Sequence, residues 1–320
     1  MTDPNYELLL DEETKAFITA TQSYYPDRGQ APTIAEIRAD YEAMCSGFAA
    51  PHPAGLSTHD SSLANGCHSI PVRWYRPEAA TASQPVMIYF HGGGFVVGGL
   101  DSHDSIVADL AAGTNLAVMA VDYALAPEAP YPAALEDAMS AVSHVLKTTD
   151  VPFILAGDSA GAWLAASVAH ALNRPEPRLI GQILIYPTLG GDIRTGSYKS
   201  HADAPLLSTE DIIWYGQQFM GTDQPHQRMG PLVETDFEHL PPTVIFAATC
   251  DPLYDDGPAY VRQICAAGGK AVCQTEDGLV HGYLRGRYQV QKIADSFARI
   301  VAAGRALAAA MRSRPECCRQ

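Results

Sequence analysis

The chain alternates short, almost continuous apolar runs with longer segments in which apolar residues recur at helical spacing. The apolar runs are 85–90, 116–121, 152–156, 180–185, 243–248 and 271–274. Such runs are typical of strands that are covered on both faces. Helical spacing predicts helices over about 104–112, 132–147, 160–173, 257–267 and 285–312. This alternation predicts a mainly parallel sheet with right-handed crossovers, flanked by helices.

The region before the first apolar run departs from this pattern. Residues 5–48 have a polar, amphipathic helical pattern with a break at 24–33. Residues 57–77 form two extended runs around Asn65-Gly66, a dipeptide that strongly favours a tight hairpin turn. We therefore expect an N-terminal helical region followed by a β-hairpin.

A second departure is the interval 188–240, which contains no obvious strand. Its clearest feature is a helical pattern over 207–220, with Ser208 as N-cap and Asp211 at the third helical position. This pair is a carboxylate variant of the capping box. The interval is too long for a bare loop between two core strands, so we expect an inserted cap element.

Composition narrows the classes of partner. The net charge of −15 at pH 7 repels phosphate backbones and anionic lipid, so we expect neither nucleic acid nor a membrane surface as a partner. The seven cysteines show no CxxC spacing, so neither a disulfide framework nor a zinc site is expected. The N-terminus is acidic where a signal peptide would be basic, and no apolar stretch could span a bilayer. The expected location is cytoplasmic.

The segment GDSAG contains Ser159 at the junction between an apolar run and an alanine-rich segment. A serine between two glycines in this context is typical of a nucleophile elbow. Gly157 and Gly161 allow a sharp turn, so the Ser159 hydroxyl is expected at the carboxyl end of the sheet. The N–H of Ala160 would then lie at a helix N-terminus, where it can donate to an oxyanion. The alternative is a small-residue turn with a capping serine.

A glycine-rich segment, FHGGGFVVGG, follows the first apolar run. Its glycines leave main-chain N–H groups free to face a common point, and no Lys follows as a phosphate-binding loop would require. An HGGG loop after an early strand is the oxyanion-hole partner of a nucleophile elbow. We expect Gly93 and Gly94 to join Ala160 as donors in the oxyanion hole, with Gly92 shaping its turn. His91 is expected to brace the loop through hydrogen bonds rather than to act as a base.

A serine nucleophile needs a base that is oriented by an acid, and in α/β-hydrolases the acid and then the His follow the Ser. The histidines after Ser159 are His170, His201, His226, His239 and His281. Only His281 follows shortly after an apolar run, at the carboxyl edge of the expected sheet. Asp251 directly follows another apolar segment and is the expected acid. Asp255 and Asp256 are expected to cap the next helix.

The motifs HGGGF, DYALAPEAPYPAALED, GDSAG, DPLYDDG and HGY, in this order, resemble the hormone-sensitive-lipase-like esterases, a family of α/β-hydrolases. The match to the family runs from about residue 70 to the end, and the stretches GGLDSHD and HADAPLLSTEDI look most like its bacterial acetyl-esterase-type members. It implies an α/β-hydrolase fold: a mostly parallel eight-stranded sheet flanked by helices, with a helical cap. The cap would comprise residues 1–50 and 190–235, and the core residues 51–189 and 236–320.

In that family, the catalytic Ser, Asp and His occupy the positions of Ser159, Asp251 and His281. The resemblance therefore implies a carboxylesterase that acts on small short-chain acyl esters, with no metal or organic cofactor. Glu128, in LAPE, is typical of the family and is interpreted as a structural carboxylate. Asp158, next to the serine, is likewise expected to support the site.

Two alternatives stay open. An amidase, peptidase or deacetylase could use the same triad, because the fold does not determine the leaving group. A binding protein of the same fold is the other alternative, although receptor relatives of this family lack the catalytic His that His281 would supply.

The cap segments carry six bulky aromatic residues that could close over a pocket: Phe17, Tyr24, Tyr25, Trp214, Tyr215 and Phe219. We expect Trp214 and Tyr215 to lie in the core of the cap rather than in the pocket wall, because aromatic side chains dominate core energetics.

The last apolar run lies in 269–276 and is the candidate edge strand of the sheet. An uncovered edge tends to pair with another chain, and the family resemblance also favours dimers. We therefore expect a homodimer that uses this edge and the neighbouring helices.

Overall fold

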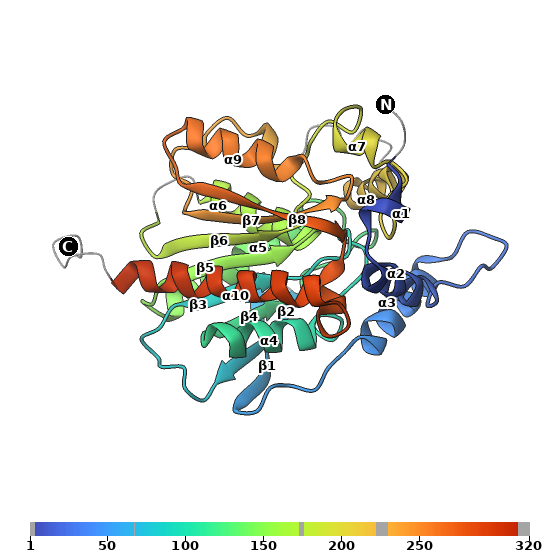
Figure 1. Cartoon of the computed structure of the whole chain (residues 1–320). Coiled ribbons are helices and arrows are strands. Elements are labelled where there is room, and N and C mark those ends of the chain that lie inside the picture. Colours follow the sequence, from blue (N-terminus) through green and yellow to red (C-terminus); the bar gives the residue numbers. More distant parts are fainter. Residues whose placement is uncertain (1–3, 67, 173–175, 222–229, 313–320) are drawn as a thin grey trace.

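An eight-stranded mixed sheet runs through the centre of the computed structural model, which describes residues 4–66, 68–172, 176–221 and 230–312 (Figure 1). The strand order is β1-β2-β4-β3-β5-β6-β7-β8. The strands are β1 (Leu56–Asn65), β2 (His68–Pro77), β3 (Val86–Phe90), β4 (Ala117–Val121), β5 (Phe153–Asp158), β6 (Leu179–Ile185), β7 (Thr243–Cys250) and β8 (Ala271–Val280). β2 is antiparallel to both β1 and β4, and the remaining pairs are parallel. The predicted α/β-hydrolase architecture is confirmed.

Helices cover both faces of the sheet. One face carries α4 (Asp104–Thr114) and α10 (Gln291–Arg312), and the other carries α5 (Ala133–Thr148), α6 (Ala160–Ala171) and α9 (Asp256–Ala266). Met87 and Tyr89 of β3 pack in the first core, whereas Ile88 and Phe90 pack in the second. Because successive strand residues point to opposite faces, burial of both faces explains the uninterrupted apolar runs.

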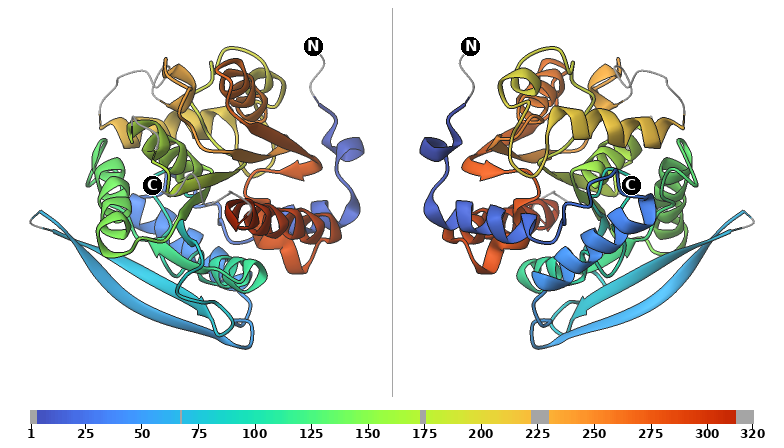
Figure 2. Two further views of the ribbon diagram at one scale, coloured as in Figure 1. Left: turned by 90° about the vertical axis from the view of Figure 1, so that its left-hand side faces the viewer. Right: turned by 90° about the vertical axis from the view of Figure 1, so that its right-hand side faces the viewer.

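The β1–β2 pair is the hairpin expected around Asn65-Gly66, and it projects from one edge of the molecule (Figure 2). Gly66 has φ +59°, a left-handed conformation that glycine adopts without steric cost.

The remaining helices gather at the carboxyl ends of the parallel strands (Figure 1). They are α1 (Tyr6–Leu9), α2 (Glu12–Gln22), α3 (Ile34–Gly47), α7 (Ser197–Ser200) and α8 (Thr209–Met220), with the short 3-10 helix η1 (Pro231–Val233) after them. The hydroxyl of Tyr6 lies 3.0 Å from Nδ1 of His201, so the N-terminal and inserted segments are in contact. The helix α8 begins with the predicted capping box between Ser208 and Asp211.

The C-terminal region differs from the prediction in two ways. The strand β8 continues to Val280, because its pairing with β7 extends past the polar residues that end the apolar run. The helix α10 begins at Gln291, because residues Tyr283–Tyr288 form the 3-10 helix η2. Five consecutive residues of η2 are buried, a pattern that one face of an α-helix cannot produce. None of the described helices has both the length and the apolar character needed to cross a membrane.

Candidate active site

Ser159 occupies the turn between β5 and α6 with φ 52° and ψ −117°, a strained conformation for a residue with a side chain. The turn is tight because two glycines flank it. A Cβ atom added at Gly161 would lie 2.0 Å from the carbonyl oxygen of Phe90, and one at Gly157 would lie 2.6 Å from the same atom. Only glycine allows the neighbouring strand to approach this closely, and the approach forces the Ser159 side chain outward.

Ser159, His281 and Asp251 form a continuous hydrogen-bonded chain. Nε2 of His281 lies 2.9 Å from Oγ of Ser159, and Nδ1 of His281 lies 2.7 Å from Oδ2 of Asp251. The other oxygen of Asp251 accepts a hydrogen bond from the N–H of Leu253 at 2.9 Å, and Asp251 is 1% exposed. An imidazole that donates from Nδ1 to a carboxylate presents the lone pair of Nε2 to the serine hydroxyl. This arrangement can remove the proton from Ser159 and orient the base that takes it.

The parallel strands explain how residues so distant in sequence meet. Asp251 directly follows β7 and His281 directly follows β8, and these neighbouring strands end at the same edge of the sheet. The ring of Tyr186, just after β6, packs edge-on against the His281 ring at a centroid distance of 4.9 Å. The imidazole is therefore held by a carboxylate on one side and by an aromatic ring on another.

Asp255 and Asp256 do not cap α9 with their side chains, so that expectation is wrong. Asp255 is the N-cap residue of α9, but no hydrogen bond from the helix reaches its carboxylate. The carboxylate of Asp255 accepts the N–H of Ser197 at 2.8 Å instead. The carboxylate of Asp256 accepts the N–H of Leu189 at 2.7 Å and the hydroxyl of Tyr198 at 3.0 Å. Both side chains thus hold the segment that follows β6, a contact between residues far apart in the sequence.

The other histidines after Ser159 lie elsewhere. His170 hydrogen-bonds the hydroxyl of Tyr260 at 2.9 Å, His201 contacts Tyr6, and His239 is exposed before β7. His226 lies outside the described residues. No cluster of three or more potential metal ligands occurs in the described ranges of the chain.

The glycine loop after β3 lies beside Ser159. Gly93 and Gly94 have φ +122° and +59°, and both line the same cavity as Ser159 and Ala160. Within the described part of the chain, nothing accepts a hydrogen bond from the N–H groups of Gly93, Gly94 or Ala160. Gly92 differs, because its N–H donates to Oδ1 of Asp158 at 2.9 Å. Its amide is therefore already engaged, and Gly92 shapes the loop without offering a donor to the cavity.

Asp158 is the anchor of this loop. Its buried carboxylate also accepts the hydroxyl of Tyr89 at 2.7 Å and that of Tyr186 at 3.2 Å. Burial by itself raises the pKa of Asp158, but the interactions with His103 and Tyr89 and the charge of Arg285 outweigh it and lower the pKa well below its usual range. An ionised Asp158 holds the glycine loop and the turn between β5 and α6 together.

His91 and Glu128 lie near the site without entering the cavity. Nδ1 of His91 lies 2.7 Å from the carbonyl oxygen of Gly92, and its ring stacks on Tyr123 at 4.2 Å. Burial lowers the pKa of His91 to about 3, so the side chain stays uncharged and braces the loop. Glu128 forms a bidentate ion pair with Arg38 of α3 at 2.7 and 2.9 Å, which links the N-terminal cap segment to the core.

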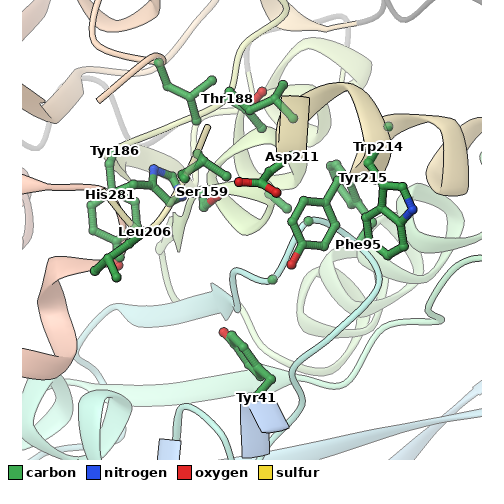
Figure 3. A pocket seen from close by; sticks show the side chains of 18 of the residues that line it. Tyr41, Phe95, Ser159, Tyr186, Thr188, Leu206, Asp211, Trp214, Tyr215 and His281 are labelled. Atoms are coloured by element: carbon green, nitrogen blue, oxygen red, sulfur yellow. Dashed lines mark hydrogen bonds between the residues drawn. The ribbon is translucent and has the colours of Figure 1, made fainter. Parts of the chain in front are cut away.

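A cavity of about 650 Å³ lies above Ser159 and His281, between the sheet and the cap (Figure 3). Five of the six cap aromatics line it: Phe17, Tyr25, Trp214, Tyr215 and Phe219. The expectation that Trp214 and Tyr215 avoid the pocket wall is therefore wrong, because α8 turns one face toward the cavity. Tyr24 is the exception, and its hydroxyl packs against Gly47 instead.

Two residues of the cavity were not anticipated. Arg285 is buried, and it donates to the carbonyl oxygen of Ser102 at 2.8 Å and to the hydroxyl oxygen of Tyr41 at 2.6 Å. Both Arg285 and Tyr41 line the cavity. No local signal could have identified them, since arginine in a segment of helical pattern is usually exposed.

Comparisons with known proteins show the family to which the chain belongs. The profile of the alpha/beta hydrolase fold family matches residues 87–285. The chain is 37% identical over 264 residues to the carboxylesterase NlhH of Mycobacterium tuberculosis, covering 78% of this chain and 80% of that protein. It is 33% identical over 232 residues to the ethyl acetate hydrolase of Pseudomonas putida, covering 68% and 72%. The structure of a hyperthermophilic esterase from the archaeon Pyrobaculum calidifontis superposes with a TM-score of 0.84 at 27% identity, over 93% of this chain and 99% of that one. The chain is thus a carboxylic ester hydrolase, and it belongs to the hormone-sensitive-lipase-like esterases of the α/β-hydrolase fold.

Proposed function

We propose that the chain hydrolyses short-chain acyl esters through an acyl-enzyme formed on Ser159. The hydrogen-bonded chain from Ser159 through His281 to Asp251, at the floor of a cavity, is the observation that carries this proposal. Oγ of Ser159 attacks the ester carbonyl while Nε2 of His281 takes its proton. His281 then gives that proton to the leaving alcohol, and Asp251 stabilises the imidazolium in between. Water repeats the two steps on the acyl-enzyme and releases the acid.

We assign the oxyanion hole to the N–H groups of Gly93, Gly94 and Ala160. Each lines the cavity at Ser159, and each lacks an acceptor among the described residues. Donors that are already oriented stabilise the negative charge of the tetrahedral intermediate without reorganisation. The anchoring of Gly92 by Asp158 supports this role, because it fixes the loop that carries two of the three donors.

The walls of the cavity support a preference for short acyl chains. The ring of Tyr215 lies so close to the glycine loop that a Cβ atom on Gly94 would be 2.2 Å from Cδ1 of Tyr215. One relative is an ethyl acetate hydrolase, which points the same way. Each methylene that fits adds only about 1 kcal/mol, so the preference among short chains is shallow until a chain meets the aromatic wall.

We expect kcat/KM to be highest for acetyl to hexanoyl esters and to fall steeply beyond roughly eight carbons, since longer chains would meet these rings. The measurement is kcat/KM for nitrophenyl acetate, butyrate, hexanoate, octanoate and palmitate at one pH. Long-chain triglyceride should be a poor substrate without interfacial activation. A maximum at octanoate or longer would contradict the short-chain assignment.

An amidase or deacetylase with the same catalytic residues is the second candidate, because the fold leaves the leaving group open. A nitroanilide that matches the best nitrophenyl ester in its acyl group separates the two. We expect turnover of the ester and little turnover of the amide. A comparable kcat/KM for both would favour the amidase.

We also propose a homodimer that forms along β8. This strand is the last of the sheet, and no described segment pairs with its outer side. Val272 of this strand is 53% exposed, so the unpaired edge carries an apolar side chain that a partner could bury. Light scattering after size exclusion at micromolar concentration should give twice the chain mass of 34.3 kDa. A species of 34.3 kDa alone would reject the dimer.

A further inference from the structure

One face of α8 brings a carboxylate and two aromatic rings into the cavity. Asp211, Trp214 and Tyr215 follow the spacing i, i+3 and i+4, which places them on the same side of a helix, and all three line the cavity. The rings of Trp214 and Tyr215 meet edge-to-face at a centroid distance of 5.0 Å. In Figure 3 the side chains of Asp211 and Tyr215 point away from α8 into the cavity that holds Ser159 and His281.

Capping uses only one of the two oxygens of Asp211. Oδ2 accepts both the N–H and the hydroxyl of Ser208, at 2.8 and 2.7 Å. Oδ1 accepts no hydrogen bond from any described residue, and no described Lys, Arg or His forms an ion pair with the carboxylate. The capping role explains why the helix tolerates an acid here, but it leaves one face of the carboxylate open to the cavity.

The described lining of the cavity carries one more negative charge than positive charge, and no cation of the lining pairs with Asp211. Arg285 is the only Lys or Arg among the described lining residues, which include the two carboxylates of Asp158 and Asp211. Asp211 lines the cavity and is also exposed to solvent, so it leaves an excess negative charge at a solvent-accessible part of the cavity, in a protein whose net charge is −15. A carboxylate beside aromatic faces is the chemistry that recognises ammonium and quaternary ammonium groups, through ion pairing and cation–π attraction.

We propose that Asp211, Trp214 and Tyr215 form a subsite for a cationic substituent of the ester, so that the enzyme favours cationic esters over neutral esters of the same shape. This inference rests on the esterase function proposed above and names the class of substrate. The same subsite would disfavour esters that carry a carboxylate, because a like charge would face Asp211.

The test compares esters that differ only in charge. For a cation on the alcohol, acetylcholine is compared with 3,3-dimethylbutyl acetate. For a cation on the acyl group, ethyl 4-(trimethylammonio)butyrate is compared with ethyl 5,5-dimethylhexanoate. In at least one pair we expect kcat/KM of the cationic ester to exceed that of the neutral one by about three- to tenfold at low salt. The pair that shows the preference tells whether the subsite serves the alcohol or the acyl group.

Asp211→Asn should bring the favoured ratio of cationic to neutral kcat/KM close to one, since the amide oxygen can still accept from Ser208. Glu210→Gln is the matched control, because it removes the same charge from the neighbouring position, which is exposed like Asp211 but does not line the cavity. The ratio should hardly change in Glu210→Gln. In the wild type, it should also fall as ionic strength rises, a readout that needs no variant.

A ratio of one or less in both pairs for the wild type would overturn the proposal. So would a ratio that survives Asp211→Asn, or one that Glu210→Gln lowers equally, since net charge rather than a subsite would then be responsible. Turnover of the neutral esters separates these outcomes from failure of the esterase function. If the neutral esters are also untouched, the esterase proposal itself fails.

Discussion

Replacing Ser159 with alanine should reduce ester turnover by on the order of 10⁶-fold, the scale seen when a serine hydrolase loses its nucleophile. The hydroxyl is the only group that the change removes, and it lies 2.9 Å from Nε2 of His281. Alanine is no more strained than serine at φ 52°, so the fold should be retained. The measurements are kcat/KM on nitrophenyl acetate, labelling by a fluorophosphonate probe, and thermal unfolding.

Ser296→Ala is a suitable control for this prediction. Ser296 is a fully buried serine whose hydroxyl lies 2.8 Å from that of Tyr283, and it does not line the cavity. The probe should label this variant and the wild type but not Ser159→Ala. Labelling of Ser159→Ala at another serine, with activity retained, would show that Ser159 is not the nucleophile.

Asp251→Asn should lower kcat by about 10⁴-fold, as when the orienting carboxylate of a serine protease is replaced. The carboxylate accepts a hydrogen bond from Nδ1 of His281 at 2.7 Å, which leaves Nε2 free to accept the proton of Ser159. An amide can instead donate to Nδ1, and the imidazole would then carry its proton on Nε2. That tautomer cannot act as the base. The pH profile of kcat, measured with nitrophenyl acetate, checks the loss across the accessible range.

Asp255→Asn is the matched comparison, four residues along the same loop. Its carboxylate accepts only the N–H of Ser197 among the hydrogen bonds described, and an amide oxygen can accept that bond equally well. We expect kcat to stay within about tenfold of the wild type, because no reacting group contacts this side chain. The reverse ranking of the two variants would mean that Asp251 is not the catalytic acid.

Much of the fold was predictable because its signals are local. The strands β3, β4 and β5 are buried on both faces. Their residues are therefore almost all apolar, and the strands can be recognised in the sequence as uninterrupted apolar runs. Turn and capping residues are equally local, as the hairpin at Asn65-Gly66 and the capping box of α8 show. The edge strand β8 was underestimated because one side of it is open, so polar residues interrupt its pattern.

The positions of Ser159, Asp251 and His281 were also within reach of the sequence. Ser159 has a distinctive local motif, and the other two directly follow strands whose carboxyl ends share one edge. The order of the elements along the chain did not reveal which residue forms a hydrogen bond with each polar side chain. Asp255 and Asp256 were expected to cap their own helix, yet they bind residues of the segment after β6, more than fifty positions away.

By itself, the sequence determined the order of strands and helices along the chain, the glycine-flanked turn at Ser159 and the family, because periodicity, turn chemistry and motif spacing depend on residues close together in the chain. Only the tertiary structure decided that Asp158 engages the amide of Gly92, that Arg285 and Tyr41 meet at the cavity, and that Asp211, Trp214 and Tyr215 of α8 line the same cavity as Ser159. Each of these contacts joins segments that are distant in the chain. The geometry of these contacts depends on how the helices at the carboxyl edge pack against the sheet. No local pattern of residues predicts that packing.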